Sequence, residues 1–98
     1  MDAKPPPNVL LVITDQQRAA DTGFMGNPVL KTPNLDALAS RAMVFDNAWV
    51  ANPVCMPNRS SLMTGRMPSA HGVIFNDRSL EPSVNTFVRG FRKSGYRT

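Results

Sequence analysis

Five branched apolar residues in a row, Val9 to Ile13, follow three consecutive prolines near the start of the chain. The run does not alternate with polar residues, so it does not match a strand with one face in water. It is typical of a strand buried on both faces, as in a parallel sheet covered by helices. The sequence therefore predicts an α/β fold from Asn8 onward. It also predicts a proline-rich leader over residues 1–7, which can neither pair within a sheet nor continue a helix.

Asp15 comes two residues after the end of this predicted strand. Ligands of open parallel sheets bind at the carboxyl ends of the strands, so a carboxylate at this place is a candidate site residue. The alternative is that Asp15 caps a turn where the strand ends. The spacing alone does not separate the two interpretations.

Apolar periodicity or helix end signals predict three later helices, over residues 33–43, 57–64 and 82–94. Residues 19–31 are predicted to form a loop, and residues 44–49 a short strand. The start and stop residues of the helices are Thr32 with Pro33, Pro57 with Gly65, and Pro82 with Gly95. The stripes assigned to the core are Leu35, Leu38, Ala39, Ala42 and Met43 in the first helix, and Val84, Phe87, Val88 and Phe91 in the last. This order indicates the opening of an α/β domain whose sheet is unfinished.

The net charge of +4 comes from the C-terminal part of the chain. Positive and negative side chains balance over residues 1–77, whereas residues 78–98 hold five cations and one glutamate. A solvated helix face is the preferred interpretation of these cations, and a nucleic-acid patch is the alternative.

The chain has one cysteine, Cys55, which cannot close an intramolecular disulfide. No apolar run approaches the roughly 18 residues of a membrane span, or the about 7–15 residues of a signal-peptide core. These features predict a cytoplasmic protein that has neither a membrane nor a nucleic acid as its partner.

The segment from Cys55 to Gly65 contains the pattern C-x-P-x-R-x-x-x-x-T-G, with Pro57, Arg59 and Thr64 at its defined positions. It resembles the signature of the type I, formylglycine-dependent sulfatases of the alkaline phosphatase superfamily. The flanking residues 7–16, 31–36 and 94–98 are also similar to that family. The resemblance covers about residues 7–98 and implies that residues 8–98 are the N-terminal portion of a sulfatase catalytic domain, with a mostly parallel sheet flanked by helices.

In that family a formylglycine-generating enzyme oxidises the signature cysteine to an aldehyde, whose hydrate attacks the sulfur of a sulfate ester. The resemblance implies that Cys55 is the catalytic nucleophile and, as formylglycine, a metal ligand, that Arg59 supports it, and that Asp15 is a metal ligand. Ca²⁺ is the first choice of divalent metal, with Mg²⁺ or Mn²⁺ as alternatives. If Cys55 begins a helix, Arg59 lies on the same face, four residues on. Taken singly, Cys55 would be a buried small hydrophobe and Arg59 a surface charge.

Gln16 stands where the family commonly has a second aspartate, and it supplies an uncharged oxygen ligand or none. The Asp-Gln pair is similar to the branch that contains choline sulfatases and phosphonate monoester hydrolases. That branch has an asparagine that binds substrate at the place of Asn76, for which the alternative is a turn residue beside Asp77. His71 lies in a stretch that the family uses as a loop, and a structural role is preferred to a catalytic one.

The Gly-Lys-x-His group and the later metal ligands of the family do not occur in these 98 residues. We therefore expect a truncated part of a longer sulfuric ester hydrolase, inactive alone and weak in metal binding, that acts on a small-molecule sulfate ester. A phosphonate monoester or phosphodiester hydrolase on the same scaffold is the alternative enzyme. A small basic binding module or an inactive fragment is the alternative from another class, and the sequence does not indicate an oligomeric state.

Overall fold

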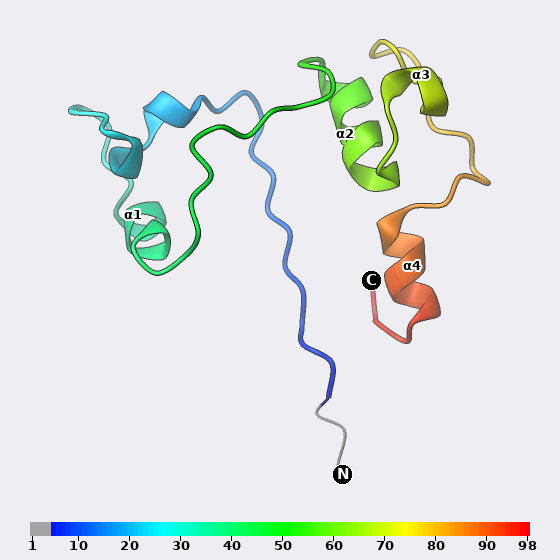
Figure 1. Ribbon diagram of the computed structural model, residues 1–98, viewed down its shortest axis with the longest axis horizontal. Coiled ribbons are helices and arrows are strands. Elements are labelled where there is room, and N and C mark those ends of the chain that lie inside the picture. Colours follow the sequence, from blue (N-terminus) through cyan, green and yellow to red (C-terminus); the bar gives the residue numbers. More distant parts are fainter. Residues whose placement is uncertain (1–4) are drawn as a thin grey trace. The chain divides into compact units, whose positions relative to one another are not determined.

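A computed structural model describes residues 5–98, and its backbone is drawn in Figure 1. The chain divides into two compact units, one ending at Phe45 and the other beginning at Asp46. Residues 1–4 of the predicted leader lie outside the described residues, and Pro5 to Pro7 have no regular structure. Each unit is described by itself below.

Every regular element within residues 5–98 is helical, and neither predicted strand is present among them. Val9 to Ile13 is not part of a ladder, and its side chains face water: Leu10 is 87% exposed. The segment from Val44 to Trp49 is likewise irregular, with Trp49 91% exposed. A strand exists only through hydrogen bonds to a neighbouring strand, and the described residues supply none. The predicted parallel sheet is therefore not confirmed.

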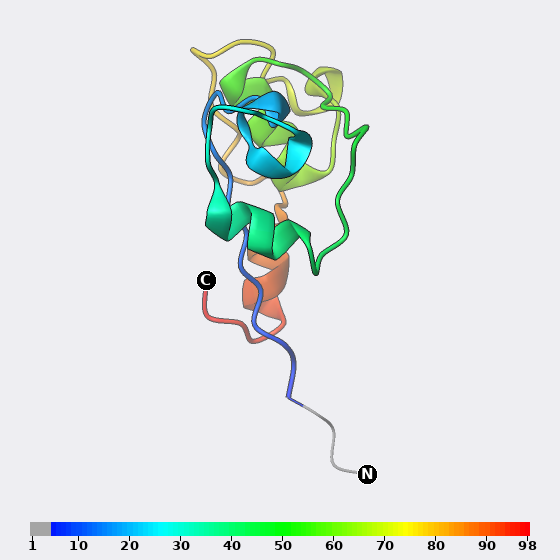
Figure 2. The same cartoon turned by 90° about the vertical axis from the view of Figure 1, so that its left-hand side faces the viewer.

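The first unit contains two 3₁₀ helices, η1 (Ala19–Asp21) and η2 (Gly23–Met25), followed by the helix α1 (Pro33–Ala39). The prediction of a loop over residues 19–31 was thus incomplete, because two short turns form within it. Thr32 and Pro33 begin α1 as predicted. The helix ends at Ala39 rather than Met43, because the N–H groups of Arg41 and Ala42 bond to carbonyls three residues back and tighten the last turn. Figure 2 shows α1 along its length.

The apolar stripe of α1 faces a hollow of about 390 Å³ in this unit. Phe24 and Met25 of η2 and Val44 and Phe45 beyond α1 line the same hollow. The stripe was predicted to be core, but Leu35 and Leu38 are still 41% and 53% exposed. The face is therefore gathered on one side of the unit without being covered.

The second unit consists of α2 (Cys55–Thr64), α3 (Pro68–His71) and α4 (Phe87–Lys93). Helix α2 packs against both α3 and α4. It stops where predicted, since Gly65 adopts the left-handed conformation at φ 67°. The packed centre of this unit is small and holds Val73, which is 1% exposed, together with Pro57, Ser60 and His71.

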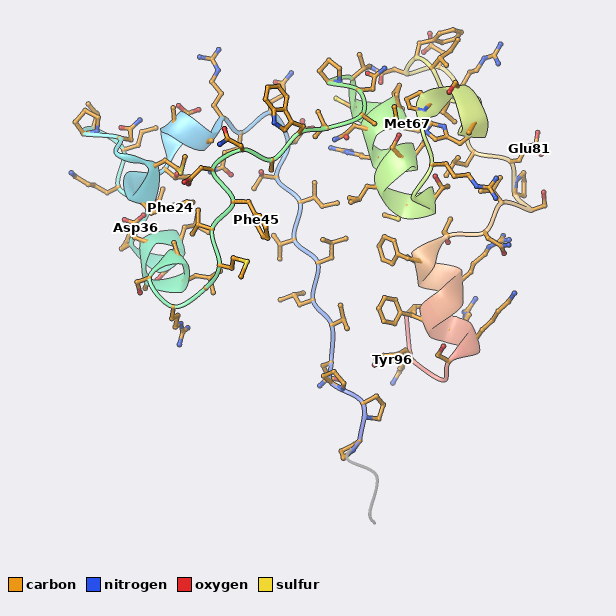
Figure 3. The ribbon with its side chains drawn as sticks, in the orientation of Figure 1. Phe24, Asp36, Phe45, Met67, Glu81 and Tyr96 are labelled. Carbon is orange, nitrogen blue, oxygen red and sulfur yellow. The ribbon has the colours of Figure 1, made fainter. Side chains whose placement is uncertain are left out.

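Helix α4 begins at Phe87, five residues later than the predicted start at Pro82. Thr86 is its N-cap, and the Thr86 hydroxyl accepts a hydrogen bond from the Arg89 N–H at 3.3 Å. Residues 82–83 form a turn instead, in which the Val84 N–H donates to the Glu81 carbonyl. The Phe91 ring meets Phe87 and Tyr96 edge to face, with centroids 6.1 and 4.9 Å away. Figure 3 shows Tyr96 on the chain that follows the helix.

The longest helix among residues 5–98 is too short and too polar to cross a bilayer.

Candidate functional site

Cys55 is the first residue of α2, and its side chain is exposed. The preceding backbone is extended at Val54, with φ −83° and ψ 140°, and the Val54 N–H donates to Asn52 Oδ1 at 2.8 Å. Pro57 is the third residue of the helix and is fully buried. The helix predicted to start at Pro57 begins two residues earlier, so the condition that Cys55 lies at a helix start is met. The first N–H groups of a helix favour anions, so an oxygen on this side chain would lie beside a positive helix end.

Arg59 lies one turn after Cys55 in α2 and is also exposed. Residues four apart share a helix face, so the cation and the candidate nucleophile project from the same side. Arg59 also lines a shallow hollow of about 200 Å³ with Met56, Ser60 and Leu80. A guanidinium beside a helix N-terminus is suited to an anionic ester or to an oxyanion that develops from it.

Asn76 reaches the start of α2 from the loop after α3. Its Oδ1 accepts a hydrogen bond from the backbone N–H of Met56 at 3.0 Å, across 20 residues of sequence. The structure thus brings Asn76 into contact with Met56, the residue that follows Cys55 in the chain. A substrate contact by Asn76 stays a prediction, and the contact observed is with the helix backbone.

His71 ends α3 and is buried, whereas the sequence placed it in a loop. Its Nδ1 accepts the Val73 N–H at 3.1 Å, so the ring proton belongs on Nε2. Nε2 lies 3.0 Å from the Ser61 hydroxyl of α2 and donates to it in this tautomer. Both ring nitrogens are engaged within the protein, which agrees with the preferred structural role. Pro68 at the helix start and Gly72 at its end, φ 75°, are signals from which α3 could have been predicted.

Thr64 completes the signature at the other end of α2. Its hydroxyl donates to the Ser60 carbonyl at 2.7 Å and accepts the Arg66 N–H at 3.2 Å. Gly65 donates its N–H to the Ser61 carbonyl at 2.8 Å. Thr64 and Gly65 therefore terminate the helix, and Cys55 lies at its opposite end, with Arg59 one turn further on.

Asp15 and Gln16 belong to the first unit, and both are exposed. Gln16 has a positive φ of 52°, a conformation that L-residues rarely adopt outside turns. Within residues 5–98 no three His, Cys, Asp or Glu side chains gather closely enough to hold a metal ion. A carboxylate and an amide oxygen are the ligand types that Ca²⁺ or Mg²⁺ takes, but they are too few to enclose it. The assignment of Asp15 and Gln16 as metal ligands stays a prediction.

Comparison with known proteins identifies the family. The family model described as Sulfatase matches residues 7–98. The chain belongs to the sulfatase family. An ulvan-active sulfatase of Formosa agariphila is 44% identical over 92 residues, covering 94% of this chain and 18% of the relative. An arylsulfatase of Clostridium perfringens is 38% identical over 93 residues, covering 94% of this chain and 19% of the relative.

The human N-acetylgalactosamine-6-sulfatase is 44% identical over 70 residues, covering 71% of this chain and 13% of the relative. The chain therefore spans less than a fifth of the length of each of these three sulfatases. Membership of the family implies an α/β fold of the alkaline phosphatase type. No solved structure gives a significant match to this chain.

Proposed function

We propose that this chain is the part of a sulfuric ester hydrolase that carries the catalytic nucleophile at Cys55. The observation that supports this most directly is the position of the signature: Cys55 is exposed at the first residue of α2, with Arg59 one turn on. The sulfatase family match over residues 7–98 supports the same reaction class. Two of the relatives are named for ulvan and for N-acetylgalactosamine, so sulfated saccharides are the substrate class to test first.

In the proposed enzyme a formylglycine-generating enzyme oxidises Cys55 to formylglycine with molecular oxygen. One hydroxyl of the hydrated aldehyde would then attack the ester sulfur as the bond to the alcohol breaks, and loss of the proton from the second hydroxyl would release sulfate and re-form the aldehyde. Arg59 holds the anionic ester or the nucleophilic oxygen on the face that it shares with Cys55. The helix N-terminus adds a favourable field for negative charge at the same place. Burial of Pro57 fixes the first turn from which Cys55 projects.

Asp15 and Gln16 are proposed as oxygen ligands of a divalent cation, Ca²⁺ by preference. Calcium takes about six to eight oxygen ligands, so further ligands have to come from other parts of the enzyme. We also propose that Val9 to Ile13 becomes a strand when neighbouring strands are present, since a sheet covered by helices would bury five apolar side chains that face water here. Asp15 would then follow a strand end, where ligands of parallel sheets bind.

The test of the function is the chemical state of Cys55 in active enzyme made together with the maturase. Trypsin releases residues 42–59 as one peptide, which contains the only cysteine of the chain. We expect this peptide to be lighter by the difference between a thiol and an aldehyde, and to react with a hydrazide but not with iodoacetamide. Cys55→Ala should abolish hydrolysis of sulfated saccharides and aryl sulfates while α2 still forms.

A peptide that is fully alkylated as an ordinary thiol in active enzyme would exclude the formylglycine mechanism. Hydrolysis of a phosphonate monoester in strong preference to every sulfate ester would instead favour the alternative enzyme on the same scaffold.

A further inference from the structure

The cap on the signature helix comes from a residue far away in sequence. Met56 follows Cys55 directly, and its N–H donates to Asn76 Oδ1 at 3.0 Å. The residue at the N-cap position, Val54, has no side-chain oxygen and makes no side-chain cap. An asparagine from the loop after α3 therefore replaces the side chain that an N-cap residue usually supplies at the start of a helix.

Two other residues of the first turn of α2 need no cap. Pro57 has no N–H, and the Asn58 N–H already bonds to the Val54 carbonyl at 2.9 Å. The Met56 N–H is thus a first-turn donor of α2 whose partner, Asn76, lies outside the helix. Because Met56 is adjacent to Cys55, a change at this amide alters the backbone that carries the nucleophile.

The loop that brings Asn76 to the helix is anchored by buried contacts. His71 joins α3 to Ser61 of α2 through Nε2, and its Nδ1 holds the Val73 N–H. Val73 is buried, with 1% of its surface exposed. Asn76 comes three residues after this fixed point, so its approach to Met56 is set by the packing of α3 on α2.

We infer that Asn76 is a positioning residue for Cys55, acting through the Met56 amide rather than through the substrate. This inference rests on the proposed function for its catalytic meaning, but not for the contact itself. The side-chain oxygen of Asn76 is occupied by the helix N–H, so its loss would loosen the first turn of α2. Loss of this contact would disturb the orientation of Cys55 more than it would weaken binding of the ester.

The contact is tested by amide hydrogen exchange at Met56 in the complete enzyme. Removing a side-chain cap corresponds to about a two- to thirtyfold change in an equilibrium constant, and we expect Asn76→Ala to speed exchange by a factor in that range. Asn76→Asp keeps an acceptor and should restore slow exchange. Asp77→Ala is the matched control, since Asp77 is an exposed neighbour in the same loop. Unchanged exchange in Asn76→Ala would overturn the inference.

The catalytic consequence is tested by kinetics normalised to the aldehyde content of each preparation. Asn76→Ala should lower kcat about two- to thirtyfold with little change in KM, whereas Asp77→Ala should match the parent enzyme. A rise in KM with unchanged kcat and unchanged Met56 exchange would identify Asn76 as a substrate contact and overturn the inference. An absence of aldehyde at Cys55 would defeat the proposed function, while the exchange experiment would still decide whether Asn76 caps the helix.

Discussion

The side chains of Ser61 and His71 join α2 to α3, with the Ser61 hydroxyl 3.0 Å from His71 Nε2. His71 is buried, and its other ring nitrogen is held by the Val73 N–H. One rotamer and one tautomer of the ring therefore satisfy both contacts. This bond fixes the short helix that leads into the loop of Asn76.

Ser61→Ala and His71→Asn should each lower the free energy of unfolding of the enzyme by about 1 kcal/mol. His71→Asn keeps an acceptor near the Val73 N–H but is too short to replace Nε2 at Ser61. Both substitutions remove the same hydrogen bond. The double variant should therefore lose less unfolding free energy than the sum of the two single losses, with a coupling energy of about 0.5 kcal/mol or more in denaturant melts. Strictly additive losses would show that the bond contributes nothing, and Ser69→Ala on the same short helix is the control.

The second prediction concerns Gly23, which lies under the carboxylate of Asp36. A Cβ added at Gly23 would come within 2.5 Å of an Asp36 oxygen. That carboxylate is not free to move away, because Asp36 Oδ1 accepts the Phe24 N–H at 2.8 Å and the Thr32 hydroxyl at 2.7 Å. Figure 3 shows Phe24 and Asp36 where η2 meets the start of α1.

Gly23→Ala should therefore break these hydrogen bonds and cost about 1–2 kcal/mol of unfolding free energy. The matched control is Gly90→Ala in α4, where an added Cβ meets nothing within 4 Å. That change should stabilise the helix by about 0.5–1 kcal/mol, since alanine is the better helix former. Equal effects of the two substitutions in thermal melts would mean that the Asp36 carboxylate moves aside at no cost in unfolding free energy.

The limits of the helices show how much of this structure could be predicted from sequence. Gly65 stops α2, and Thr32 with Pro33 starts α1, because left-handed glycine and first-turn proline act through local stereochemistry. Helix α4 was predicted to start too early because two start signals compete. Pro82 suits a first turn, but the Thr86 hydroxyl caps the helix at its actual start.

Contacts between distant residues could not be predicted in the same way. Nothing in the sequence around Asn76 indicates that its oxygen reaches the Met56 amide, since the contact depends on how α3 packs against α2. The strand predicted over Val9 to Ile13 depends in turn on partners in a sheet, so its apolar pattern alone does not produce it. The signature was the opposite case: its spacing placed Cys55 and Arg59 on one helix face, and α2 does extend from Cys55 to Thr64.

The third prediction tests Arg59 as the cation of the site. Removal of one donor that stabilises developing negative charge typically costs about 10²–10³ in kcat, so Arg59→Ala should lose at least a hundredfold. Arg59→Lys keeps the positive charge but not the planar guanidinium, so its kcat should lie between those of the parent enzyme and Arg59→Ala. Arg66→Ala, an exposed arginine just beyond α2, should retain the parent rate. The rates are compared per aldehyde, so that an effect of Arg59 on the conversion of Cys55 is separated from its effect on turnover.

A full rate for Arg59→Ala at equal aldehyde content would remove Arg59 from the reaction. A defect confined to aldehyde content would instead place Arg59 in recognition by the maturase.

The last prediction concerns residues 1–98 produced on their own. Leu10, Val12 and Trp49 are 87%, 74% and 91% exposed, and the apolar face of α1 lines an open hollow. Each large apolar side chain left in water forgoes about 1.5–3 kcal/mol of burial, a substantial share of the stability of a small domain. We expect the isolated segment to bind a hydrophobic dye and to melt without a cooperative transition.

Trp49 is the only tryptophan, so its emission should be that of a solvated indole and acrylamide should quench it readily. Leu10→Ser with Val12→Ser should reduce dye binding while the helical signal is retained. A sharp two-state melt of a soluble monomer with a shielded Trp49 would show that these residues bury their apolar surface without the rest of a sulfatase domain.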